Sequence, residues 1–505
     1  MTSPYFFLQQ HICFDSILAN VLTFARLSSS HLYHCKNHIS KYRSQSWVKI
    51  KAIILFLNLT PLGYAIEFYY FNFFPLALFI LSMRSLHLIS LLEKTMASLL
   101  RSLLSPIITL SLFVLANNFF ITFLSVSLNS QGVSTSLIGA LHSINYAGFM
   151  FGALKSESII RRVGHIRAFA AFACLNMSTY LVHGMFSFPV TWLAMRFCAG
   201  FTIATMFVVV ESWLLSKSSR NTRGVILSIY MITLYTSQGA SQYIIDIVDI
   251  MTSMPFVVAA LLCSLSILPL TITRTPAPEL EKAEPISLRS LLRISPFGVI
   301  SCMMSGYIIS TIYSFVPIFA QEKFLSVSLV MSVTIAGGFL LQWPIGKLSD
   351  IFDRRKVLTI LCWAMLFPAL FIIVLPSVPF LILPLSFLFG GLCFSINPVS
   401  VTQVCDHIET QHITGATSML FVVYGFGAIL GPLTTPFFVK HISPAAPYIS
   451  ISLGAVLLGI LGLYTLKHRK PIPPEEKQDF IRSTGTSSVS YEMNPNVETP
   501  EDQNK

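Results

Sequence analysis

Long apolar segments recur along this chain, and they limit its fold more than any other feature. From Pro106 onward, twelve segments are apolar over about 20 residues, the length that a helix needs to cross about 30 Å of hydrocarbon. Apolar residues make up 54% of the chain and its mean hydropathy is +0.70. A water-soluble core could not bury this much apolar surface, so the sequence predicts an all-α polytopic membrane protein.

Each predicted span is an apolar run of sufficient length that lies between two polar loops. They are residues 106–128, 137–154, 168–186, 189–214, 225–247, 254–273, 296–320, 327–346, 357–375, 378–403, 413–439 and 445–466.

The loops between these spans alternate in charge, which predicts how the chain crosses the membrane. The chain has 33 Lys and Arg residues against 22 Asp and Glu residues. Fifteen of the positive residues lie in the loops after spans two, four, six and eight. The odd-numbered loops contain two, Lys323 and Lys440. Positive residues collect on the cytoplasmic side. We therefore expect both ends of the twelve-span unit in the cytoplasm, and no nucleic-acid partner.

An internal repeat divides the spans into two sets of six. The segment "SPIITLSLF" at Ser105 is similar to "SPFGVISCM" at Ser295, and "GALKSESIIRRVGHIR" after span two is similar to "GKLSDIFDRR" after span eight. Repeats of this kind build transporters whose two bundles rock about a central site. The sequence thus predicts two pseudo-symmetric six-helix bundles, residues 96–273 and 296–466, joined by a cytoplasmic linker at 274–295.

The two terminal segments have no counterpart in the repeat. Residues 1–95 form an N-terminal extension that is either not translated, with synthesis starting near Met96, or a peripheral hydrophobic hairpin. Residues 467–505 are polar and contain several prolines, a composition typical of disorder. We expect them to form a disordered cytoplasmic tail.

Two short motifs carry a resemblance to a known family. The strip "GKLSDIFDRR" resembles the loop Gly-x-Leu-x-Asp-x-x-Gly-Arg-Arg of the major facilitator superfamily, with Asp353 in place of the second Gly. Residues Arg196 to Gly200 resemble its Arg-x-x-x-Gly element. The stretches "RRVGHIRAFAAF" and "VVVESWL" are similar to a poorly characterised bacterial branch of the YcaD type. The resemblance covers about residues 96–467 and implies a transporter of the cell inner membrane.

In that family the charged loop holds one conformation closed through Asp and Arg contacts that break on switching. The resemblance therefore implies a conformational latch. Its candidate residues are Gly346, Asp350, Arg354, Arg355, Arg161, Arg162 and Glu211. The alternative is that the basic residues only set the orientation, although acidic residues contribute little to orientation. The first-half copy lacks the expected Asp and has Glu157 as the only acid nearby.

Two ionisable residues, Arg196 and Glu211, lie well inside a span, and both are in the fourth. A charge there is costly and needs a partner or an aqueous cavity. About 22 Å of helix separates them, so they cannot pair. We expect Glu211 near the loop of Arg161, Arg162 and Arg167, where the resemblance implies a switching role; proton transfer is the alternative. Arg196 could contact an anionic substrate or coupling partner, or bond backbone carbonyls.

Polar side chains in the spans supply the other candidates for substrate binding or coupling. By the resemblance, spans one, four, seven and ten line the cavity, and spans two and five flank it. The candidates are Asn117, Asn118, Tyr307, Ser310, Tyr313 and Asn397, with His142, Asn145, Gln238 and Gln242 in the flanking spans. Hydrogen bonds between helices are the alternative role of each.

The predicted function is secondary active transport of a small solute by alternating access. A Gly-x4-Gly-Lys-Ser/Thr loop for ATP is absent from the sequence, and so are the motifs of a membrane enzyme. The alternatives are a facilitative uniporter, a non-transporting receptor or a membrane enzyme, and proton coupling and the direction of transport stay open. We expect a monomer without cofactor or metal; "DHIETQH" (Asp406 to His412) is expected to be a solvated loop.

Overall fold

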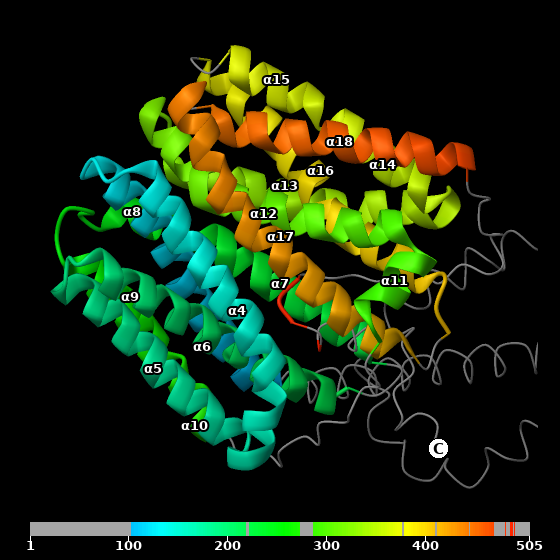
Figure 1. Ribbon diagram of the computed structural model, residues 1–505. Coiled ribbons are helices and arrows are strands. Elements are labelled where there is room, and N and C mark those ends of the chain that lie inside the picture. Colours follow the sequence, from blue (N-terminus) through cyan, green and yellow to red (C-terminus); the bar gives the residue numbers. More distant parts are fainter. Residues whose placement is uncertain are drawn as a thin grey trace, which may run out of the picture. The chain divides into compact units, whose positions relative to one another are not determined.

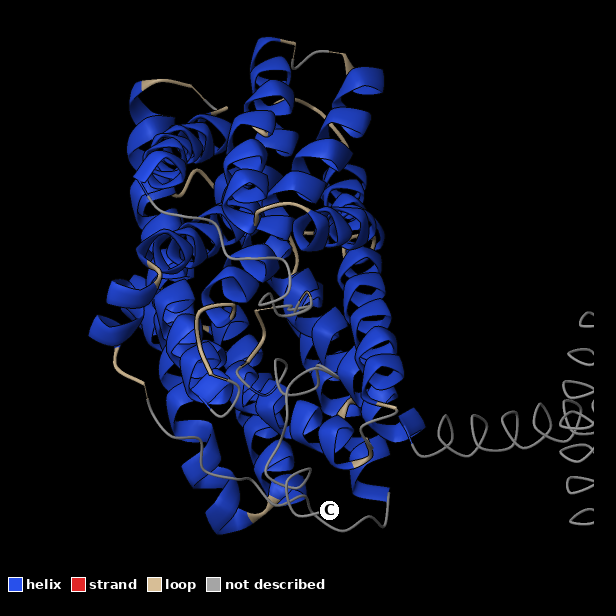
Figure 2. Cartoon of the chain, turned by 90° about the vertical axis from the view of Figure 1, so that its right-hand side faces the viewer, coloured by secondary structure: helices blue, strands red, loops and turns tan. Residues whose placement is uncertain are grey.

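The computed structural model describes residues 103–218, 222–272, 286–375, 378–409, 412–443, 445–468, 480, 485–487 and 489. The regular structure within them is helical (Figures 1 and 2). The predicted N-terminal extension, residues 1–95, lies outside the described residues.

The first half of the bundle comes from residues 103–272. Its helices are Leu103–Ser130, α4 (Thr135–Val163), α5 (His165–Met185), α6 (Pro189–Ser216), α7 (Arg223–Ser241), α8 (Ile244–Ile247), α9 (Met254–Leu265) and α10 (Ile267–Ile272).

The second half follows a short helix in the predicted linker, α11 (Leu288–Ile294). Its helices are α12 (Pro296–Glu322), α13 (Val327–Ile351), α14 (Arg354–Ala364), α15 (Leu366–Val374), α16 (Pro379–Cys405), α17 (Ile413–His441) and α18 (Ala446–His468).

The helices agree with the predicted spans in position. Among the described residues, ten helical segments are long and apolar enough to cross a membrane, with α9 and α10 counted as one segment and α14 and α15 as another. Predicted spans three and five correspond to α5 and α7, which are helical but are not among these ten. Both carry many polar residues; α5, for example, contains Arg167 and Asn176. The structure is therefore all-α and polytopic, as predicted.

The same pairs of helices pack in each half. In the first half α4 packs along α6, and in the second half α13 packs along α16. Each pair meets at a glycine. A Cβ on Gly200 of α6 would lie 1.9 Å from the backbone oxygen of Asn145, and a Cβ on Gly390 of α16 would lie 2.0 Å from that of Thr334. These glycines let the backbones approach closely, as small residues do in membrane helices.

We expect Gly200→Ala to destabilise the first half by about 1–3 kcal/mol, because the added methyl group would overlap backbone atoms that cannot rotate away. The measurement is thermal unfolding of the purified chain in detergent. Gly239→Ala is the matched control, since its Cβ meets nothing within 4 Å. Equal melting temperatures for the two variants would contradict the close-approach role of Gly200.

Contacts between the two halves include the helix pair α4 with α17, which lie next to each other in Figure 1, and the pair α7 with α13. Ser143 of α4 donates a hydrogen bond to the backbone oxygen of Ile429 at 2.8 Å, and Ser332 of α13 donates one to that of Gly239 at 2.9 Å. Asn129, at the end of the first helix, donates one to Gln321 at 3.1 Å. These bonds lie toward the predicted outer ends of their helices, so the halves are joined there.

Residues of the predicted tail also lie against the bundle. Gly485, Thr486, Ser487 and Val489 are buried, and Phe480 is partly buried. Figure 1 shows this short segment in red, within the group of helices. Its packing differs from the disorder predicted for residues 467–505.

Candidate functional site

A cavity lies between the two halves, and both contribute to its wall. The first half lines it from its first helix, α4, α6 and α7, and the second half lines it from α12, α16 and α17. Its volume is about 110 Å³, and the space is partly open to the outside. Transporters built from two repeats bind their substrates at this position, between the repeats.

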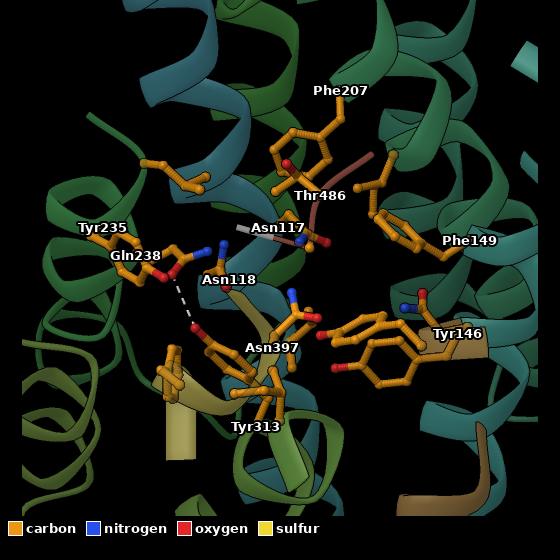
Figure 3. A pocket seen from close by; sticks show the side chains of 18 residues that line it. Asn117, Asn118, Tyr146, Phe149, Phe207, Tyr235, Gln238, Tyr313, Asn397 and Thr486 are labelled. Carbon is orange, nitrogen blue, oxygen red and sulfur yellow. Dashed lines mark hydrogen bonds between the residues drawn. The ribbon is translucent and has the colours of Figure 1, made fainter. Parts of the chain in front are cut away.

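Five amide side chains reach this cavity. They are Asn117, Asn118, Asn145, Gln238 and Asn397. All five were candidates from the sequence, and Figure 3 shows four of them around the central space. Each amide offers both donors and an acceptor, so together they can hydrogen-bond a polar solute without adding charge.

Aromatic rings form most of the remaining wall. They are Tyr146, Phe149, Phe207, Tyr235, Tyr313, Phe394 and Tyr424 (Figure 3). Tyr313 was a candidate from the sequence, and it donates a hydrogen bond to Gln238 at 3.0 Å across the two halves. The other six were missed because aromatic residues are common throughout the spans. A partial signal was available, since Tyr146 and Phe149 follow Asn145 on the same helix.

The cavity wall carries no charged side chain among its described residues. Of the 18 residues that line it, none is Asp, Glu, Lys, Arg or His. The wall is therefore polar, aromatic and uncharged. An ion entering this space would lose part of its hydration without gaining a charged partner there.

Four polar candidates lie outside the cavity wall and hydrogen-bond other groups of the bundle. His142 shares a hydrogen bond with Ser125 at 2.8 Å, and Tyr307 accepts one from Thr434 at 3.1 Å. Gln242 accepts one from Thr122 at 2.8 Å, and Ser310 donates one to the backbone oxygen of Tyr307 at 3.1 Å. The contacts of His142, Tyr307 and Gln242 are of the alternative kind, hydrogen bonds between helices, whereas that of Ser310 lies within α12.

Arg196 is fully buried but does not line the cavity. Its guanidinium lies 5.9 Å from the ring centroid of Phe120, an arrangement that allows a cation–π interaction. None of its three guanidinium nitrogens has a hydrogen-bond partner among the described residues. The expected bonds to backbone carbonyls are therefore not seen in this conformation.

Glu211 is also fully buried, near the predicted cytoplasmic end of α6. Its carboxylate accepts hydrogen bonds from Tyr230 of α7, from Thr486 at 2.5 Å and from Ser487. We expected it near Arg161, Arg162 and Arg167. Arg161 instead pairs with Glu157 on its own helix at 2.9 Å, with both side chains about 40% exposed.

Arg162 and Gly346, two further candidates for the latch, do not lie together. Arg162 is exposed on the last turn of α4. Gly346 of α13 is covered by the C-terminal segment, since a Cβ there would lie 2.5 Å from the ring of Phe480.

The charged loop of the second half forms a network around Arg354. Its guanidinium bonds Asp406 at 2.7 Å, Asp350 at 3.0 Å and Ser349 at 3.0 Å. The side chains of Arg354 and Asp406 are 2% and 3% exposed, whereas that of Asp350 is 38% exposed. The expectation of a solvated loop is thus wrong for Asp406. A guanidinium buried at the start of α14 needs a carboxylate, and the end of α16 supplies it.

Asp353 has a local role that the sequence analysis missed. It is the N-cap of α14, where it accepts a hydrogen bond from the backbone N–H of Arg355 at 3.0 Å. It also pairs with the Arg355 side chain at 2.7 Å. Asp is a favoured N-cap residue, so it can replace the Gly of the family motif while fixing Arg355 in place.

Known proteins resemble the chain in both sequence and fold. The model of the Major Facilitator Superfamily matches residues 106–326 and 323–491. Proteins described as uncharacterized MFS-type transporter YcaD, from Escherichia coli strains SMS-3-5 and 55989, are 29% identical over 388 residues, which is 73% of this chain and 97% of each relative.

Two solved structures share the fold. The nucleoside transporter NupG has a TM-score of 0.59 and 15% identity, with 73% of this chain and 100% of that chain covered. A bacterial homolog of the human lysosomal transporter Spinster, inward-facing and occupied, has a TM-score of 0.60 and 12% identity, with 74% and 97% covered.

The family model and the relatives match most of the length of this chain. The helical bundle and the cavity between its halves are consistent with that match. The chain belongs to the major facilitator superfamily, and it is a multi-pass membrane transporter.

Proposed function

We propose that this transporter carries a small, uncharged, polar solute across the bacterial inner membrane by alternating access. The observation that supports it is the cavity wall, which combines five amides with seven aromatic rings and has no charged residue among those described. Amides can replace the hydration of hydroxyl, carbonyl and amine groups. Aromatic faces favour a solute with a flat or apolar side.

The same wall favours a facilitative uniporter over proton coupling. Proton coupling needs a group that takes up and releases protons as the solute binds and leaves. The two ionisable candidates of the fourth span, Arg196 and Glu211, both lie outside the residues that line the cavity in this conformation, and we propose that Glu211 meets the solute through hydrogen bonds without exchanging a proton. We therefore propose that the solute gradient drives transport.

The network around Arg354 is placed to keep one end of the second half rigid. Its ion pairs join the end of α13, the start of α14 and the end of α16 within one half. We propose that this network keeps the predicted cytoplasmic end of the second half rigid while the halves move. The contribution of Arg161 and Arg162 is smaller in this proposal, because Arg161 has an exposed partner on its own helix.

The test is solute flux into liposomes that contain the purified chain, with a panel of uncharged and charged solutes. We expect flux of an uncharged polar solute that changes less than twofold when a pH gradient is imposed. Asn118→Leu should lower the apparent affinity about fivefold to tenfold, because one hydrogen bond in the cavity is lost. The bond described for Asn118 goes to its own helix, at Val114, so folding should survive.

The matched control is Thr109→Val, on the same helix. Thr109 is buried and does not line the cavity, so parental flux is expected. A pH gradient that accelerates flux, with the acceleration lost in Glu211→Gln, would instead establish proton coupling. Flux of charged solutes alone would contradict the proposal.

A further inference from the structure

The chain itself occupies part of its own cavity. Gly485 and Thr486 are among the residues that line the space, and Figure 3 labels Thr486. They belong to the C-terminal segment, whose described residues are Phe480, Gly485, Thr486, Ser487 and Val489. They are separated from the end of α18 by more than a dozen residues. These two residues lie where a solute entering between the halves would pass.

The segment is held by hydroxyl groups on Glu211. Thr486 donates to one carboxylate oxygen at 2.5 Å, and Ser487 donates to the other. Tyr230 donates to the same oxygen as Thr486, and the two hydroxyls lie 2.8 Å apart. All these side chains are buried. Hydrogen bonds to a carboxylate are the stronger kind, and here one oxygen receives two hydroxyls and the other receives one.

Further contacts of the segment reach the second half. A Cβ on Gly485 would lie 3.3 Å from the amide of Asn397 and 3.4 Å from the ring of Tyr424. Gly485 has a φ of +65°, which glycine adopts at little cost. The ring of Phe480 lies against Gly346 of α13. The segment thus contacts Glu211 in one half and Asn397, Tyr424 and Gly346 in the other.

We propose that Glu211 and Tyr230 form a subsite for two neighbouring hydroxyl groups, and that Thr486 and Ser487 occupy it as an internal, competing ligand. The corresponding external ligand is a solute with adjacent hydroxyls. The identification of that ligand as transported solute rests on the proposed function, whereas the occupancy by the segment does not.

The occupied state should resist transport for two reasons. The segment fills the place of a hydroxyl-bearing ligand, and it ties together two halves that must move against each other. A solute can bind only when the segment leaves. The apparent affinity for the solute is therefore its intrinsic affinity multiplied by the fraction of chains in which the subsite is open. The segment therefore acts as an inhibitor built into the chain.

The first test measures whether the segment covers the cavity. Asn397→Cys is introduced into the full chain after its nine native cysteines are replaced, and the rate of maleimide labelling is measured. Combining Thr486→Val with Ser487→Ala should raise that rate at least tenfold, because both hydroxyl bonds to Glu211 are lost. Thr486→Ser keeps a hydroxyl and should leave the rate near that of the parent.

A second reporter shows that the effect is local. Met251→Cys, in the exposed loop before α9, should be labelled equally in all these variants. An unchanged rate at position 397 in the double variant overturns the occupancy. Faster labelling at both reporter positions overturns it as well, because general loosening would then explain the result.

The second test identifies the ligand chemistry in the Thr486→Val, Ser487→Ala chain. Inositol, with adjacent hydroxyls, should slow labelling at position 397 at least threefold, whereas cyclohexanol at the same concentration should not. Glu211→Gln should remove the protection. Equal effects of both alcohols, or none, would overturn the hydroxyl subsite. Neither test requires transport, so a failure of flux alone would reject the proposed function and leave this inference standing.

Discussion

Replacing Asp406 with Ala should lower the free energy of unfolding by about 3–5 kcal/mol, because the change leaves a buried guanidinium without its main carboxylate. Asp406 and Arg354 are 2.7 Å apart, and both side chains are almost completely buried. Removing one partner of such a pair is far more costly than removing both. The measurement is thermal or denaturant unfolding of the purified chain in detergent.

Asp350→Ala is the matched control for this prediction. Asp350 binds the same guanidinium at 3.0 Å, but its side chain is 38% exposed, so water can replace it and the expected loss is about 0–1 kcal/mol. The double variant Arg354→Met, Asp406→Leu should recover most of the stability lost in Asp406→Ala. Equal losses from Asp350→Ala and Asp406→Ala would show that burial does not distinguish the two carboxylates.

The difference between these two acids also shows what the sequence could predict. Asp350 lies in a motif four residues from Arg354, so helical spacing alone brings the two side chains together. Asp406 lies 52 residues further on than Arg354, in a segment that was expected to be a solvated loop. Only the packing of α14 against α16 brings them together, and no local pattern encodes that packing.

Some residues of the cavity wall could be predicted from the sequence and others could not. The amides stood out because a polar side chain in an apolar span is rare and needs a reason. The aromatic lining did not, since 41 Phe and 17 Tyr residues are spread over the chain. A ring that faces the cavity and one that faces lipid look alike in sequence. Their separation depends on the rotation of each helix, and the spans show little amphipathic pattern because they are apolar on all sides.

The C-terminal segment was the least predictable part. Its polar composition predicts disorder, and the sequence gives no sign that Thr486 and Ser487 lie next to Glu211. What the sequence did show was the need of Glu211 for a partner, because a buried carboxylate in a span is costly. The partner expected was an Arg. The hydroxyl groups of Tyr230, Thr486 and Ser487 bind this carboxylate instead.

Arg196 presents the opposite situation, a buried charge without a hydrogen-bond partner among the described residues. Arg196→Met should leave the stability equal to that of the parent or raise it by about 1–4 kcal/mol, since an apolar side chain of similar length removes the cost of burying the charge. The same variant should lower transport at least tenfold. A charge that is kept inside a membrane at a cost to stability is expected to have a function.

The physical basis of this prediction is the state of the three guanidinium nitrogens. None has a hydrogen-bond partner among the described residues, and the nearest favourable contact is the ring of Phe120 at 5.9 Å. Arg196 therefore contributes little to the stability of this conformation. We expect its guanidinium to form hydrogen bonds in the other conformation or in the solute-bound state. Unfolding and flux are measured on the same preparation. A variant that transports normally but unfolds more easily would show that Arg196 only connects helices.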